Sequence, residues 1–547
     1  IKLAADIDID STLVITGELV LDLNGKMLKM TGGGSVFEIG SEKTKERGKL
    51  TVVDSDTTKE HKFEPNTDHL WVLDETDGTK TVHGGIIYGG RASSGGGVNV
   101  ENGTLIMEGG SIVGCQAVYT YAGGSGSGGG VRVSVDGSFE MYQDAGIYGC
   151  GASGYGDGVG SGGGVEIDGG GSGESGTFVM HGGTIEGCMS GGIGGGVSND
   201  GVFVMKGGSI RSCSVVSTGS EEGRGGSIHF SGSTTISGKA EVSAPNNGKL
   251  HIVGRKTLTI SGDAEIKASM DLEGDLYADG GTVRGEVATT GAITGSEGAT
   301  GTTTFTTAVE SSGTIENGVF EGTVYSRTSY GAQKAAVIRG GTFKGKVESY
   351  SSIENGVFKG EVTNGGTITG GTFKGVVTCE GHPSNVDKGS LEGGTVSGGS
   401  FDKTIQVIFG TIIGEEYTGK WDGRKPSAAF LGEKHTLTYQ ADGKDYAWQV
   451  LSKDFFPVMP QGPDKEGHAF LSWFYKGGKH DGEMVDEGDP PNENRTAVAR
   501  YATGSGTEQD PCRIGSMEEL LLFRLQVNRF GRTDLCAVLT NDIVINS

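Results

Sequence analysis

Four of the seven cysteines stand at the same point of a repeated segment, each three residues after an isoleucine: Cys115, Cys150, Cys188 and Cys213. No two cysteines are spaced as Cys-x-x-Cys, which argues against a zinc site. Two interpretations remain open. The thiols fill a buried stack as small apolar groups, or neighbouring coils about 4.8 Å apart carry disulfides, since that spacing suits the Cα separation of a disulfide. Cys188 with Cys213 is the first pair to expect.

No set of residues has the spacing of a recognised catalytic site. Cleavage of a polysaccharide needs clustered carboxylates for general acid and base work, or acidic calcium ligands with a basic residue. The sequence has no Asp-Asp pair, no Gly-His-Gly and no His-Glu-x-x-His, and its arginines are scattered. A single segment, residues 154–158, weakly resembles a calcium-binding nonapeptide that works only in tandem. We therefore predict no catalytic residue, no metal and no cofactor, with a polysaccharide lyase or glycoside hydrolase as the alternative.

Tyrosines in two loops are the candidate ligand-binding residues. The loop 116–127 carries Tyr119 and Tyr121, and the loop 151–161 carries Tyr155 and Asp157. Both loops follow a cysteine of the repeated segment, so we expect them on one face. A tyrosine among glycine and serine offers a rigid ring and a hydroxyl, which suits contact with a glycan or a protein. The alternative is that these loops are decoration without a ligand.

The repeats that position these residues predict a stack of short strands. Equivalent residues recur in phase as Met107, Met141, Met180 and Met205, as Val98, Val131, Val165, Val197 and Ile228, and later as Phe320, Phe343, Phe358, Phe373 and Phe401. Side chains alternate along a strand, so in-phase apolar residues point to one side. Glycine makes up 105 of 547 residues, and its doubled and tripled runs mark corners. Residues 1–412 are therefore predicted to form one all-β parallel solenoid with these residues inside.

Composition limits the partners. The formal net charge is −24, which disfavours nucleic acid. No stretch approaches 18 apolar residues, so we do not expect a membrane-spanning segment.

The N-terminal segments resemble a known family. Residues 1–9 and 20–26, with the Gly-Gly-Thr-Ile and Gly-Gly-Gly-Val units, resemble adhesin-like β-helix proteins of Gram-positive bacterial surfaces, which have a pectate-lyase-like fold. The resemblance implies a right-handed parallel β-helix, a non-catalytic role and an extracellular, cell-surface location, with signal peptide and anchor outside this chain. We expect an adhesin or structural stalk that contacts host or bacterial glycans or surface proteins. A pure spacer with no ligand is the further alternative.

The C-terminal third changes in composition. Residues 437–502 read as alternating strands, and Gly467 to Tyr475 matches the Gly-x-x-Phe-x-x-Trp-Phe-Tyr core of the Listeria–Bacteroides repeat, except that Ser472 replaces the usual glycine. This resemblance implies a small β-grasp-like module over 413–503. Residues 504–547 are predicted to be a linker, a helix from Met517 to about Asn528 opened by a capping box, and a strand over 537–545.

The two ends of the sequence match. Residues 1–11 align with residues 537–547, with leucine, aspartate, two isoleucines and serine at equivalent positions. We expect either tandem repetition or end-to-end assembly, in which the C-terminal segment caps a following β-helix. The alternative is that both ends were simply cut.

Overall fold

The computed structural model describes residues 1–544 apart from residues 42, 122, 155–158, 171–173, 217–224, 245–248, 255, 297, 299, 330–333, 382–393, 416–426, 461, 487, 489 and 529–530. It divides into two compact units, residues 1–325 and 326–547, and each is described by itself. The described secondary structure is almost entirely β-strand, and the sheets of the repeats are parallel. This confirms the predicted all-β solenoid fold.

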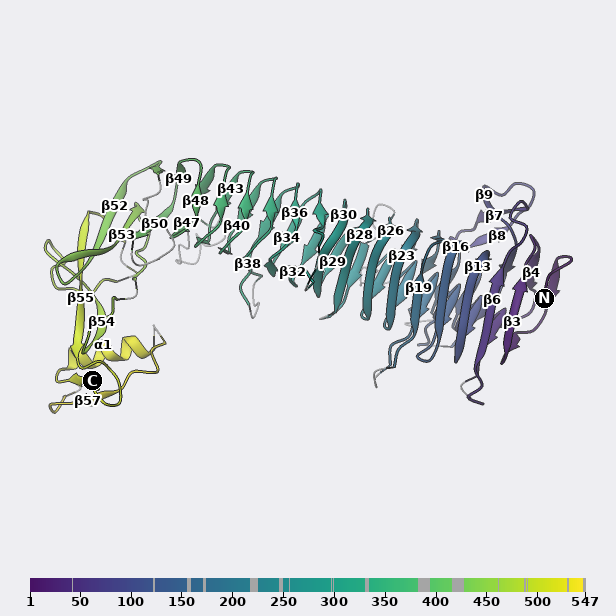
Figure 1. Ribbon diagram of the computed structural model, residues 1–547, viewed down its shortest axis with the longest axis horizontal. Coiled ribbons are helices and arrows are strands. Elements are labelled where there is room, and N and C mark those ends of the chain that lie inside the picture. Colours follow the sequence, from purple (N-terminus) through teal and green to yellow (C-terminus); the bar gives the residue numbers. More distant parts are fainter. Residues whose placement is uncertain are drawn as a thin grey trace. The chain divides into compact units, whose positions relative to one another are not determined.

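The first unit is a stack of coils whose equivalent strands pair in parallel, residue on residue (Figure 1). The long sheet contains β1 (Ile7–Ile9), β3 (Glu18–Asp22), β4 (Met27–Met30), β6 (Gly48–Val53), β10 (Ile86–Tyr88), β13 (Gly103–Val113), β16 (Ser138–Tyr148), β19 (Thr177–Met180), β20 (Thr184–Glu186), β23 (Val202–Arg211), β26 (Ser233–Val242), β28 (Thr257–Ile266), β30 (Asp275–Val283), β32 (Ile293–Thr294), β33 (Thr304–Phe305), β35 (Thr314–Ile315) and β36 (Val319–Phe320).

A second sheet runs along the coils, and a third, five-stranded sheet is present in some of them. The second sheet contains β2 (Leu13–Ile15), β5 (Phe37–Ile39), β12 (Val98–Val100), β15 (Val131–Val133), β18 (Val165–Ile167), β22 (Val197–Asn199), β25 (Ile228–Phe230), β27 (Lys249–Ile252), β29 (Ser269–Leu272), β31 (Val287–Thr289) and β34 (Val309–Ser311); β37 (Val324–Ser326) lies at the unit boundary. The third contains β11 (Arg91–Ala92), β14 (Gln116–Val118), β17 (Gly151–Ser153), β21 (Met189–Ser190) and β24 (Ser214–Val215).

In-phase apolar residues form the core of these coils. The four repeated methionines stack in register and are fully buried, as are the four repeated valines with Ile228. Their burial removes apolar surface from water along the whole stack. A stack that the repeats did not reveal joins Phe139, Phe178 and Phe203, whose ring centroids are 4.5 and 5.1 Å apart.

The four repeated cysteines also stack inside the coils, as free thiols. Each thiol donates to the backbone carbonyl two residues before it, at 3.3–3.6 Å. Burial raises the pKa of Cys150, Cys188 and Cys213 well above the ordinary thiol value. The structure therefore shows cysteines as packing groups, without a bond between Cys188 and Cys213.

A three-stranded antiparallel sheet interrupts the repeats. It consists of β7 (Glu60–Pro65), β8 (Trp71–Leu73) and β9 (Lys80–His83) and lies over successive coils of the first unit (Figure 1). Trp71, at its tip, stacks on Tyr148 with centroids 5.6 Å apart. The glycine before each of three cysteines makes room for it, because a Cβ on Gly149 would lie 2.0 Å from Trp71 Cγ. We call Trp71 with Gly114, Gly149 and Gly187 the tryptophan cradle.

The second unit begins with narrower coils. Their strands are β38 (Val337–Ile338), β39 (Thr342–Phe343), β40 (Val347–Ser349), β41 (Ser352–Ile353), β42 (Val357–Phe358), β43 (Val362–Asn364), β44 (Thr367–Ile368), β45 (Thr372–Phe373), β46 (Val377–Cys379), β47 (Gly394–Val396), β48 (Ser400–Phe401), β49 (Ile405–Val407) and β51 (Ala428–Phe430). Phe343, Phe358, Phe373 and Phe401 stack with ring centroids 4.6–4.7 Å apart, as the repeats predict. Parallel pairing reaches β51, beyond residue 412.

A mixed sheet follows the coils. Its strands run in the order β50 (Gly410–Glu415), β53 (Lys444–Ser452), β52 (Lys434–Ala441), β55 (Arg495–Thr503) and β54 (His468–Tyr475), with only β52 and β55 parallel. Trp473 is fully buried and donates its indole N–H to Pro460 O at 2.7 Å. The strands β52, β53, β54 and β55 lie where the sequence predicts alternating strands, whereas β50 precedes that range.

The last described elements are β56 (Cys512–Ile514), α1 (Met517–Asn528) and β57 (Ala537–Leu539). The helix has its predicted bounds. Ser516 accepts from the N–H of Glu519, whose carboxylate accepts from Gly515 N–H. The strand predicted over 537–545 is too long, because β57 ends at Leu539 and the Thr540 N–H bond to Ile514 O is the last backbone bond to β56 among the described residues; Ile545 lies outside them. No helix in the described part of the chain is long and apolar enough to cross a membrane.

Candidate functional site

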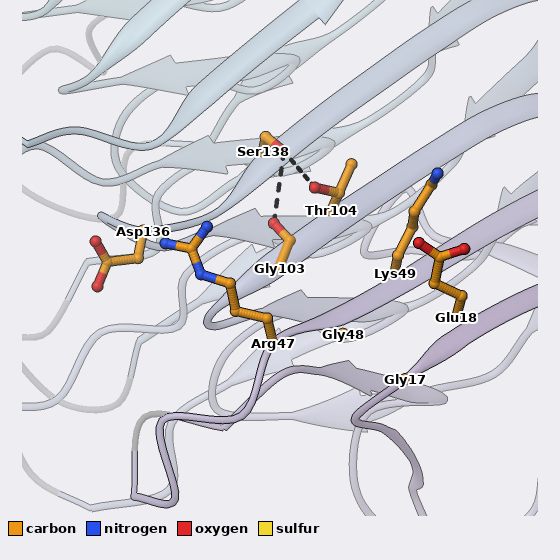
Figure 2. Close-up of a pocket in the computed structure, with 9 residues that line it drawn as sticks. All are labelled: Gly17, Glu18, Arg47, Gly48, Lys49, Gly103, Thr104, Asp136 and Ser138. Atoms are coloured by element: carbon orange, nitrogen blue, oxygen red, sulfur yellow. Dashed lines mark hydrogen bonds between the residues drawn. The ribbon is translucent and has the colours of Figure 1, made fainter.

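A polar pocket lies in the first unit, where the turn after the second sheet enters the long sheet. We call it the corner pocket; its volume is about 460 Å³, and it is lined by Gly17, Glu18, Arg47, Gly48, Lys49, Gly103, Thr104, Asp136 and Ser138 (Figure 2). Four strands contribute side chains to one wall because Glu18, Lys49, Thr104 and Ser138 follow one another in register on β3, β6, β13 and β16.

The lining glycines let the coils come together at this corner. A Cβ on Gly48 would lie 1.9 Å from Ile15 O, and one on Gly103 would lie 2.1 Å from Gly48 O. Only glycine fits such a close approach of backbones. The same positions leave backbone rather than side chains beside the polar groups of the pocket.

The charged groups of the corner pocket are available to a ligand. Figure 2 shows Glu18 with Lys49 at one end and Arg47 with Asp136 at the other. Within the described part of the chain, none of these four side chains forms an ion pair or a hydrogen bond. Between these two charged pairs, the Ser138 hydroxyl donates to Thr104 Oγ1 at 2.9 Å. The pocket therefore offers cationic hydrogen-bond donors, carboxylate acceptors, and hydroxyls that can donate as well as accept.

A second polar cluster lies further along β16. Tyr142 donates its hydroxyl to Glu140 Oε2 at 2.8 Å, and His181 Nε2 is 3.6 Å from the same oxygen. The rings of Tyr142 and His181 are stacked 4.6 Å apart. The hydrogen bond to Glu140 raises the pKa of Tyr142. Since this carboxylate is already engaged by two partners, we do not include the cluster in the pocket.

Two of the four loop residues predicted to bind a ligand are described. Tyr119 is 36% exposed and Tyr121 is 76% exposed, and their rings meet edge to face with centroids 6.2 Å apart. Tyr155 and Asp157 lie outside the described residues. The loops that carry both pairs leave β14 and β17, which pair in parallel, so they start from neighbouring coils of one sheet. The tyrosine loops and the corner pocket are formed by different parts of each coil.

The corner pocket could not be found in the sequence, because its lining residues belong to four coils and are of different chemical types. A usable signal was the glycine at the start of four strands of the long sheet: Gly17 and Gly137 directly precede β3 and β16, and Gly48 and Gly103 open β6 and β13. In the described residues, no group of three or more histidine, cysteine or acidic side chains is placed to hold a metal ion.

The comparisons with known proteins gave no relative: no family model, no curated protein and no solved structure matches the chain.

Proposed function

We propose that this protein is an extracellular bacterial cell-surface β-solenoid, of the adhesin type, that binds a polyhydroxylated ligand, a glycan, at the corner pocket. The supporting observation is the set of four charged side chains without partners around the Thr104 and Ser138 hydroxyls. The surface location rests on the resemblance of the repeats to surface β-helix proteins.

The chemistry of a glycan suits these groups. Sugar hydroxyls both donate and accept, so they can satisfy Lys49 and Arg47 as well as Glu18 and Asp136. Hydrogen bonds to charged groups contribute about 1.5–3 kcal/mol each. Because the charged groups have no protein partner to give up, binding costs their desolvation and the ordering of ligand and side chains, but no broken ion pair. The exposed pair Tyr119 and Tyr121 provides a second, independent contact surface.

A glycan array followed by calorimetry tests this proposal. Lys49→Met removes the ammonium and keeps the apolar stem, and we expect it to weaken binding by about 10- to 100-fold. Lys239→Met is the control, since Lys239 is also a lysine on a strand of the long sheet, although it is exposed where Lys49 is half-buried. Equal affinity of the two variants would place the ligand elsewhere.

The alternatives give different results in the same experiment. New reducing ends or unsaturated sugars would indicate a polysaccharide-cleaving enzyme, with Glu18 and Asp136 as the carboxylates to test. An array without any binding would indicate a pure spacer. If Lys49→Met binds normally and Tyr121→Ala does not, the tyrosine loops are the binding face.

A further inference from the structure

The C-terminal strand β57 has one unpaired edge. On its other edge it pairs in parallel with β56, with Arg513 opposite Val538 and Ile514 opposite Leu539. All three residues of β57 are exposed, Val538 to 45% and Leu539 to 58%. No strand among the described residues pairs with the free edge. An exposed strand edge of this kind is a template for another strand.

The sequence match between residues 1–11 and 537–547 falls on residues that make contacts in the first coil. Leu3 is buried, and its N–H donates to Asp22 O at 2.9 Å. Asp6 Oδ1 accepts from Met27 N–H at 2.9 Å, and Ile7 pairs with Leu28. The equivalent residues of the C-terminal segment are identical: Leu539, Asp542 and Ile543.

The positions at which the two segments differ are exposed in the first coil. They are Ile1, Lys2, Ala4, Ala5, Asp8 and Asp10, which correspond to Ala537, Val538, Thr540, Asn541, Val544 and Asn546. Lys2 contacts Ser55 Oγ at 2.7 Å and Asp22 Oδ2 at 3.4 Å, and Val538 cannot make these contacts. The match keeps the buried Leu3 position, the acceptor Asp6 and the paired Ile7, and these are the contacts on which a shared docking place depends.

We propose that residues 537–544 of one copy of this chain dock on the first coil of a second copy, in the place that residues 1–8 of that copy occupy. Leu539 would then replace Leu3 beside Asp22, and β57 would lie between β56 and β3 of the second copy. This is strand addition to a sheet edge. The contact joins different surfaces of the two copies, so it propagates from copy to copy instead of closing as a dimer.

The strength of this contact depends on competition between the C-terminal segment of one copy and the N-terminal segment of the other for the same place. The contacts that the C-terminal segment would make are nearly the same as those of residues 1–8, which it displaces. Residues 1–8, however, are covalently tethered to their place, at an effective concentration on the order of mM. The unaltered chain is therefore expected to associate only weakly. Weakening the docking of residues 1–8 should strengthen the association, because the receiving place is then open.

Sedimentation of full-length variants tests the proposal. We expect Leu3→Asp with Ile7→Asp to associate at least tenfold more tightly than the unaltered chain, with masses that increase beyond a dimer. The control adds Leu539→Asp and Ile543→Asp to the same background and should return to a monomer. Since both variants carry the same damage to the first coil, association of both would indicate misfolding and would overturn the proposal, as would a monomeric Leu3→Asp/Ile7→Asp variant.

A cross-link gives a second measurement without that damage. Lys2 and Asp22 pair in parallel, so Val538→Cys of one copy should reach Asp22→Cys of another at high protein concentration. Cys536→Ser removes the only exposed native thiol. We expect disulfide-linked oligomers from this variant and none when Lys239→Cys replaces Asp22→Cys. Equal cross-linking of the two variants would overturn the proposal. Glycan binding is not involved, so this test and that of the corner pocket fail independently.

Discussion

The tryptophan cradle provides a test of how the inserted sheet is held. Gly149 has φ +54°, and a Cβ there would lie 2.0 Å from Trp71 Cγ and 2.2 Å from Cδ1. Gly149→Ala therefore adds two costs. Left-handed backbone costs an alanine about 1–2 kcal/mol, and the methyl group displaces Trp71, which is 5% exposed. Loss of a buried aromatic contact costs about 3–5 kcal/mol.

A double-mutant cycle separates the two costs. With Trp71 present, we expect Gly149→Ala to cost about 4–7 kcal/mol of local stability, as the sum of the two contributions. With Trp71→Ala, the same change should cost only the backbone contribution, about 1–2 kcal/mol. Gly443→Ala, measured by exchange of the β52 and β53 amides, is the control for backbone strain alone, since Gly443 has φ +78° and no atom lies within 4 Å of the position that a Cβ would take.

Hydrogen exchange of the β7–β9 amides is the assay, because it reports the opening of this sheet and not of the whole chain. Exchange should accelerate at least a hundredfold in Gly149→Ala, since each factor of ten corresponds to about 1.4 kcal/mol. If Gly149→Ala has the same effect with and without Trp71, the steric argument is refuted and only the backbone conformation matters.

Three further predictions concern buried groups. Phe358→Ala should lower local stability by about 3–5 kcal/mol, measured by hydrogen exchange in the adjoining coils, and unchanged exchange would contradict a packed aromatic stack. One thiol of seven, Cys536, should react quickly with a maleimide in the native protein and all seven in urea; burial raises the pKa of Cys379 to about 12, so rapid modification there would contradict the structure. Burial raises the pKa of Glu166 well above its ordinary value, so the fold loses stability as pH rises above about 4.3, where the unfolded side chain ionises. Glu166→Gln should therefore raise the urea midpoint at neutral pH but not at about pH 3.5, and an equal gain at both values would contradict the assignment.

The solenoid could be predicted from sequence because its packing is periodic. Met141 and Met180 lie at equivalent positions of successive repeats, and a strand places such residues on the same side. The helix at Met517 was predictable from its local capping residues. The C-terminal strand was predicted too long because alternation of apolar residues does not report where a pairing partner ends.

The tryptophan cradle and the corner pocket could not be predicted because they join residues that no period relates. Trp71 lies in an insertion without repeats, and its contact with Gly149 spans 78 residues of chain. Lys49 and Ser138 line one pocket only because a further coil, with Thr104 on β13, is stacked between them in register. The role of these four charged side chains could not be predicted either, because whether a charged side chain has a partner is known only once its neighbours in the fold are known.

Stacked coils have a mechanical consequence. The backbone hydrogen bonds between coils run along the direction of stacking. When the chain is pulled from one end, the coils therefore detach from the stack one at a time. In the narrow series, Phe343, Phe358 and Phe373 are each fifteen residues apart, and each released coil adds about 50 Å of extended chain. A protein built in this way lengthens in small, repeated steps under load, and it dissipates work while the remaining coils keep their fold.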